Sequence, residues 1–135
     1  MRGRALARFA AVLMACGRVD GAHAEDGDAA RGQRVFQYCY ACHSVDPNEK
    51  AQLQGPTLYH IIGRPAASLT GFDYSDAMKT RAATGLTWDA ATLDTYVADP
   101  QTVVPGTRMS APSLRDAQDR ADLIAYLARS GPYQP

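Results

Sequence analysis

The chain has 135 residues, a length typical of one domain. Hydrophobic residues make up 46% of it and charged residues 21%, as in ordinary globular proteins, and the formal net charge is zero. Without a surplus of lysine and arginine there is no basic stripe for phosphates, which excludes nucleic-acid binding driven by charge.

The first 24 residues have the pattern of a secretory signal. Arginines at positions 2, 4 and 8 precede a short apolar run over residues 9–16, and Ala22-His23-Ala24 follows as a cleavage site. The apolar run is too short to span a bilayer. We therefore expect residues 1–24 to be a signal peptide that exports the chain to the periplasm. A buried N-terminal helix is one alternative, and a lipid anchor on Cys16 is another.

Cleavage of this signal would change both the charge and the cysteine content. Four of the 14 basic residues and one of the 14 acidic residues would leave, so residues 25–135 would carry a formal charge of −3. Cys16 would also leave. Cys39 and Cys42 would then be the two remaining cysteines of the mature domain.

A short helix is predicted from Asp28 to Tyr38. Val35 and Phe36 are its apolar members, and Gly32 lies one turn before them. Glycine inside a helix costs about 1 kcal/mol relative to alanine. We therefore expect Gly32 to serve the close approach of another helix.

Cys39, Cys42 and His43 follow this helix in the order Cys-x-x-Cys-His. The spacing has four interpretations: a redox disulfide, half of a zinc site, a structural disulfide, and attachment of c-type haem. Zinc usually takes four ligands, and His23 and His60 are the other histidines of the chain. Positions i and i+3 share one face of a helical turn. Both thiols can therefore reach the vinyl groups on one porphyrin edge, which favours haem.

The segment after this motif is mostly loop. A polar loop over residues 46–50 and an apolar run over 58–62 precede a further loop over 65–74. A short helix is predicted for Ser75–Ala83, and Gly85 is expected to stop it.

A third helix is predicted after Gly85. Thr87 is its expected N-cap, with Asp89 in the first turn, where a carboxylate favours the helix dipole. Asp99-Pro100 is expected to end it. Its apolar residues at helical spacing are Leu93, Tyr96 and Val97.

The C-terminal part predicts one more helix. Residues 101–116 contain prolines and a glycine and are expected to be irregular, whereas Asp119–Arg129 has an apolar face. No alternating strand pattern occurs anywhere in the sequence. We therefore predict an all-α fold of short helices and long loops. Such a small domain is marginal without a covalent staple, and haem would supply one.

A haem iron held by His43 needs a sixth ligand. The candidates are Met78, Met109, His60 and His23. Most methionines serve core packing. Met109, however, lies in a loop shaped by Pro105 and Gly106, which favours it as the ligand.

The chain resembles the class I cytochromes c of the mitochondrial and bacterial c2 type. The resemblance covers most of residues 27–130. It rests on the stretches C39-Y-A-C-H43, G55-P-T-L58, G63-R64, G71-F-D-Y74, G85-L-T-W88, P105-G-T-R-M109 and R120-A-D-L-I-A-Y-L127. The resemblance implies a small cytochrome c fold wrapped around one covalently attached haem c.

The resemblance also implies roles at the iron. Cys39 and Cys42 would form thioether links to the haem, and His43 and Met109 would be the axial ligands. The carbonyl of Pro56 would accept a hydrogen bond from His43 and so orient the imidazole.

Other residues match positions around the haem. Arg64, Tyr74 and Trp88 match the donors that surround the buried propionates, which need hydrogen bonds. Tyr96 and Thr107 match positions beside the axial methionine. The resemblance also places Gly32 and Phe36 where the N-terminal helix crosses the C-terminal helix, near Leu123 and Tyr126.

Three features depart from the family pattern. Ala111 stands where many relatives carry an aromatic residue over the haem edge, and Met78 stands where many carry a polar residue. Tyr59-His60 replaces a His-Gly pair. We interpret Met78 as core filling, with a rival axial ligand as the alternative, and His60 as an exposed or core histidine.

The ring of lysines that mitochondrial relatives carry around the haem edge is also missing. Lys50 and Lys79 are the two lysines of the chain. Arg34, Arg108 and Arg115 would form a reduced basic patch, or would be scattered solvated arginines.

The implied function is one-electron transfer and not enzyme catalysis, because iron with six ligands has no open site. The expected protein is a soluble, monomeric periplasmic carrier. It would take electrons from a dehydrogenase or a cytochrome bc1-type quinol-oxidising complex and pass them to a terminal oxidase or a photosynthetic reaction centre. The alternative is a haem sensor or peroxidase-like protein that acts after Met109 leaves the iron.

Overall fold

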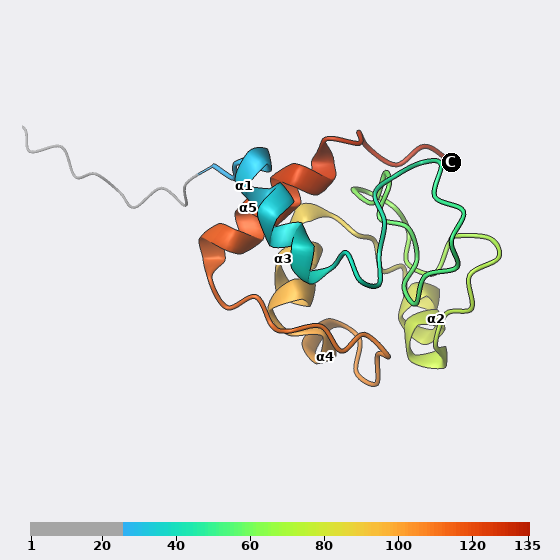
Figure 1. Ribbon diagram of the computed structural model, residues 1–135. Helices are drawn as coiled ribbons and strands as arrows, with labels where there is room; N and C mark the ends of the chain where they lie inside the picture. The colour runs from blue at the N-terminus through green and yellow to red at the C-terminus, as the bar shows by residue number, and fades with distance from the viewer. Residues whose placement is uncertain (1–25) are drawn as a thin grey trace, which may run out of the picture.

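The computed structural model describes residues 26–135, so the predicted signal peptide and His23 lie outside the described residues (Figure 1). Within this range the chain is all-α and forms no strand, as the sequence predicts. An isolated antiparallel bridge joins Pro65 and Thr87. The elements are α1 (Ala29–Val35), the 3-10 helix η1 (Phe36–Tyr38), α2 (Asp76–Ala83), α3 (Ala90–Ala98), α4 (Pro100–Val103) and α5 (Ala117–Ala128).

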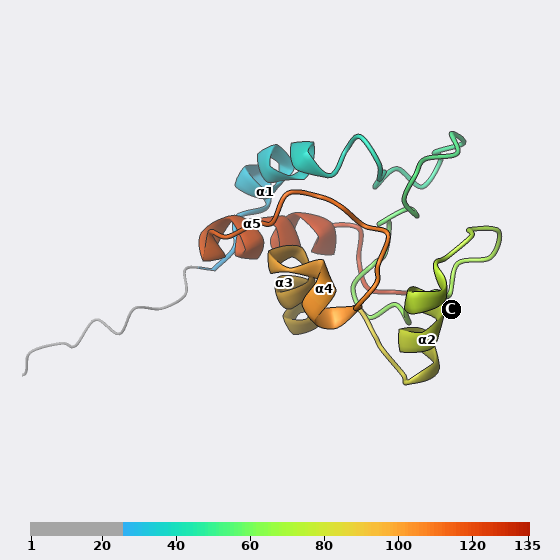
Figure 2. The ribbon, with the colours of Figure 1, turned by 90° about the horizontal axis from the view of Figure 1, so that it is seen from below.

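Helices α1 and α5 cross in direct contact, as both views show (Figures 1 and 2). At the crossing, a Cβ added to Gly32 would lie 1.9 Å from the backbone oxygen of Asp122. Only glycine permits this approach, which confirms the expected use of Gly32. The rings of Phe36 and Tyr126 lie 5.4 Å apart beside it, and Leu123 is 1% exposed.

A buried carboxylate joins the two helices at the same crossing. Asp122 is 1% exposed and accepts hydrogen bonds from Nε of Arg31 at 2.6 Å, from the backbone N–H of Asp28 at 2.7 Å, and from Gln118 at 2.9 Å. A buried carboxylate needs such partners to offset its lost hydration. The hydrogen bonds from Arg31 hold the pKa of Asp122 far below its usual range.

The structure corrects two expectations about helix boundaries. Asp89, not Thr87, caps α3: its side chain accepts from the backbone N–H of Thr92 at 2.7 Å, whereas Thr87 pairs with Pro65. The region predicted to be irregular contains most of α4. Asp99 accepts from the N–H of Gln101, and Pro100 occupies the first turn of α4, where its missing N–H costs nothing.

Helix α2 lies apart from the other helices, on the opposite side of the molecule from α1 (Figures 1 and 2). Ser75 caps it by accepting from the N–H of Met78, and Gly85 ends the segment with a φ of 84°. The long loop over 39–75 connects η1 to α2. Within residues 26–135, no helix has the length and apolar character needed to cross a membrane.

Candidate functional site

The Cys-x-x-Cys-His motif forms a helical turn that continues η1. The backbone N–H groups of Cys42 and His43 both donate to the carbonyl of Cys39, at 3.1 and 3.0 Å. Both thiols are free and half-buried. The turn therefore presents two sulfurs and an imidazole within one short segment.

The ring of His43 is fixed by the next loop. Its Nδ1 lies 2.7 Å from the carbonyl oxygen of Pro56, which is the contact that the family resemblance implies. An imidazole that donates from Nδ1 keeps the Nε2 lone pair free for a metal. Burial lowers the pKa of His43, which favours the neutral, metal-binding form.

Gly55 makes room for this ring. A Cβ added there would lie 2.2 Å from Cε1 of His43, closer than any side-chain carbon can come. Sequence reasoning gave Gly55 no role in the site. Its position directly before Pro56 is the signal that could have found it.

The environment of the Cys39 thiol does not favour a redox-active cysteine. Burial, together with the neighbouring Cys42, raises the pKa of Cys39 to about 11. Reactive cysteines have lowered pKa values because the thiolate is the nucleophile. This environment argues against a thiol oxidoreductase and suits a cysteine that is consumed in a thioether link.

Met109 lies half-buried in the loop after α4 and packs against the core. Its backbone N–H donates to Oγ1 of Thr107 at 3.2 Å, and the same Oγ1 lies 2.9 Å from the phenol oxygen of Tyr96. Val104, which is fully buried, anchors the start of this loop. Tyr96 and Thr107 therefore lie beside Met109, as the resemblance implies.

The rival ligands are placed differently. Met78 is on α2, half-buried against the core. The ring of His60 stacks on that of Tyr59 at 3.9 Å, and its backbone N–H donates to Ser130. His60 is thus engaged with its neighbour and with the C-terminal segment.

Arg64, Tyr74 and Trp88 come from three loops and meet on one side of the site. Arg64 is 2% exposed and donates to the carbonyls of Thr57 and Tyr59. Burial raises the pKa of the Tyr74 phenol, and the nearby positive charge of Arg64 partly offsets this rise. The backbone N–H of Trp88 donates to the carbonyl of Arg64 at 2.9 Å, and its ring lies 4.8 Å from that of Tyr96.

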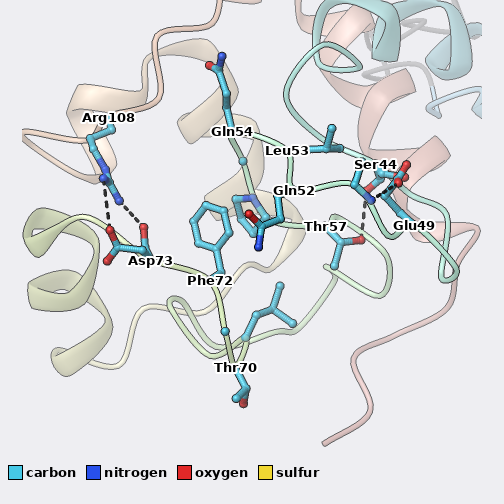
Figure 3. A pocket seen from close by; sticks show the side chains of 15 residues that line it. Ser44, Glu49, Gln52, Leu53, Gln54, Thr57, Thr70, Phe72, Asp73 and Arg108 are labelled. Atoms are coloured by element: carbon cyan, nitrogen blue, oxygen red, sulfur yellow. Dashed lines mark hydrogen bonds and ion pairs between the residues drawn. The ribbon is translucent and has the colours of Figure 1, made fainter.

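A cavity of about 730 Å³ opens between the loop before Pro56 and the loop that ends at Tyr74 (Figure 3). This volume is within the usual range for ligand and cofactor sites. Of the predicted site residues, Pro56 alone lines the cavity, whereas Cys39, Cys42, His43 and Met109 are not among its lining residues. Phe72 projects into the cavity. The sequence prediction missed Phe72 and Gln54 as lining residues. They lie on loops, where no periodicity marks which side chains face inward.

The donor set fits haem better than a bare metal ion. Within the described part of the chain, no three histidine, cysteine, aspartate or glutamate side chains come together as a metal site. A haem iron would need only two further ligands from the protein, and c-type haem would also need two cysteines for its attachment. One imidazole with a fixed ring, two thiols on one turn and a loop methionine meet that requirement.

The chain is similar to known proteins over most of its length. The sequence profile of the Cytochrome c family matches residues 29–130. A cytochrome c2 from Rhodomicrobium vannielii is 50% identical over 102 residues, covering 76% of this chain and 78% of that protein. A cytochrome c2 from Rhodoblastus acidophilus is 45% identical over 103 residues, covering 76% of this chain and 92% of that protein. The structure of cytochrome cH from Methylobacterium extorquens superposes with a TM-score of 0.67 at 42% identity, covering 76% of this chain and 99% of that one.

Sequence and overall fold agree with these relatives. The chain belongs to the cytochrome c family and is a cytochrome c2-like electron carrier with one covalent haem c, not an enzyme.

Proposed function

We propose that the chain carries its haem on Cys39 and Cys42, with His43 and Met109 as axial ligands, and acts as a periplasmic one-electron shuttle. The observation that carries this proposal is the 2.7 Å contact between Nδ1 of His43 and the carbonyl of Pro56. It leaves Nε2 as the free nitrogen and fixes the direction of the ring. When bound, the haem supplies the one-electron redox couple.

The residues around the haem would set its potential. A thioether ligand such as Met109 favours the ferrous state, and burial disfavours the extra charge of the ferric state, so both raise the potential. Buried Arg64 and half-buried Tyr74 would offer donors for the propionates. Tyr96 and Thr107 would hold the loop that carries Met109.

The partners that we propose are redox proteins: a dehydrogenase or a cytochrome bc1-type complex as donor, and a terminal oxidase or reaction centre as acceptor. Residues 1–24 would export the chain to meet them. Docking would rely on uncharged contact near Ala111 and Pro112, with Arg115 alongside. Arg108 is less available for docking than the sequence suggested, because it is paired with Asp73 (Figure 3).

The decisive experiment combines mass spectrometry with a reductive titration of the purified mature protein. After acid-acetone extraction the protein should keep the mass of one haem. Its ferric form should show the charge-transfer absorption of a methionine–iron bond. Colourless protein with two free thiols would rule out attachment. A ferric form that binds small ligands freely would favour the sensor or peroxidase-like alternative.

A further inference from the structure

Helix α2 is placed as a lateral support for the loop that carries Met109. None of its residues is fully buried, and it has no extensive contact with another helix of the described chain. Its attachment to the rest of the molecule therefore depends on its flanking loops and on a few side chains. Two of these side chains are arginines that reach between the α2 segment and the Met109 loop.

The first arginine lies on α2 itself. Nε of half-buried Arg81 donates at 2.8 Å to the carbonyl oxygen of Val103, the last residue of α4. Val103 is buried, and the next residue, Val104, is fully buried. The hydrogen bond therefore joins α2 to a rigid point at the start of the Met109 loop.

The second arginine points the opposite way. Arg108, the residue before Met109, donates to the backbone oxygen of Asp73, and its NH1 lies 3.8 Å from the carboxylate of the same residue (Figure 3). Asp73 lies three positions before the first residue of α2. This contact joins the end of the Met109 loop to the segment that leads into α2.

The two segments also lie close together between these contacts. A Cβ built at Gly106 would lie 3.5 Å from the Cβ of Ala77, so the space between the loop backbone and α2 is about the size of one methyl group. Residues 73–81 and 103–108 are thus joined by one arginine contact at each end and lie near each other between the two.

We propose that Arg81 and Arg108 form a two-point clamp, and that the clamp sets how readily Met109 leaves the iron. Arg81 and Arg108 are positioning residues: neither would touch the haem iron, and both act through the loop. Release of either end would loosen the loop on α2 and raise the fraction of molecules with an open sixth position. The inference rests on the proposed ligation by Met109.

The test is the binding of imidazole to the ferric holoprotein, because imidazole competes with Met109 for iron. Apparent affinity scales with the fraction of open molecules. Arg81→Gln should lower the imidazole dissociation constant about fivefold, the effect of losing one ordinary hydrogen bond. Arg108→Gln should lower it about threefold, since its ion pair is exposed and screened. Arg81→Lys keeps a donor and should restore part of the lost resistance to imidazole.

Arg129→Gln is the matched control, because Arg129 is an exposed arginine at the C-cap of α5, outside residues 73–81 and 103–108. It removes the same charge and should leave the dissociation constant unchanged. The clamp is refuted when Arg81→Gln or Arg108→Gln binds imidazole as weakly as the wild type does. Wild-type protein without the methionine–iron absorption would instead refute the proposed ligation itself.

A measurement on the wild-type protein covers the case in which the variants do not fold. Amide hydrogen exchange is followed with and without saturating imidazole. Displacement of Met109 should accelerate exchange in residues 104–109 and also in α2, while α1 and α5 stay protected. Acceleration confined to residues 104–109 would show that α2 does not move with the loop, and would overturn the proposal.

Discussion

Gly55 lies directly against the imidazole of His43, where a side chain would collide with Cε1 at 2.2 Å. The following residue, Pro56, supplies the carbonyl that fixes Nδ1. One dipeptide therefore does two things for the same ring: it makes room for the imidazole and it sets its direction. Proline also restricts the backbone of the residue before it, which helps to hold this arrangement.

Gly55→Ala should displace the imidazole and weaken the axial bond. Forcing one carbon into a filled space costs roughly 1–3 kcal/mol. We expect a lower yield of holoprotein, a lower reduction potential, and a lower midpoint of unfolding in guanidinium. Gln52→Ala is the control, because Gln52 is exposed in the same loop. Normal potential and stability in Gly55→Ala would show that the loop can shift without cost.

Met109→Ala should abolish the methionine–iron charge-transfer absorption. It should also lower the reduction potential, because the thioether that favours ferrous iron is lost. Met78→Leu conserves volume on α2 and should leave the absorption intact, with a stability cost below about 1.5 kcal/mol. Optical spectra and redox titrations of both variants decide the assignment. The opposite pattern would make Met78 the ligand.

The family, the fold class and the Cys-x-x-Cys-His turn were predictable because they depend on local spacing. Gly32 was informative for the same reason: a glycine in a helix implies a close neighbour, and Asp122 is that neighbour. The N-cap of α3 was misassigned because Thr87 and Asp89 are both good caps. A long-range pairing of Thr87 with Pro65 decided between them.

The contacts between α2 and the Met109 loop could not have been predicted in this way. Arg108 and Asp73 are 35 positions apart, and Arg81 reaches Val103 across 22 positions. The sequence suggested instead that Arg108 belongs to a surface patch. Contacts between loops depend on the whole fold, and no periodicity reports them.

Asp122 should make the stability of the protein depend on acid pH. Its folded-state pKa is depressed by the hydrogen bonds from Arg31, so the unfolded chain takes up a proton first as the pH falls. The stabilisation is complete above about pH 4, near the ordinary carboxyl pKa. It is lost as the pH falls towards the lower folded-state pKa.

Asp122→Asn removes this titration. The variant should be less stable than the wild type at neutral pH, and the gap should narrow steadily below about pH 4. Guanidinium unfolding across this pH range measures the gap. Asp119→Asn removes a carboxylate from the same helix and is the control. The difference in unfolding free energy between this variant and the wild type should stay constant across the pH range. A gap that stays constant down to low pH would mean that Asp122 stabilises the helix crossing by packing alone.

Electron transfer to the partner should depend little on salt. Long-range steering needs uncompensated charge and is screened over a Debye length of about 8 Å at physiological ionic strength. Residues 25–135 carry a formal charge of −3. Lys79 lies 3.6 Å from Asp73 and 3.8 Å from Asp76, and Arg108 lies 3.8 Å from Asp73, so nearby carboxylates offset both cations.

Uncharged contact must then supply much of the docking energy. Ala111 is half-buried and Pro112 exposed after the Met109 loop, and Tyr38 and Tyr40, on either side of Cys39, are 62% and 68% exposed. Weak redox encounters need only a small interface, so such side chains suffice. Stopped-flow rates with the physiological acceptor should change by less than about tenfold between low and high salt, because steering of an uncharged patch is weak. Arg115→Glu should slow the reaction only modestly. A rate that falls by orders of magnitude with added salt would show that a local basic patch dominates docking despite the negative net charge of the domain.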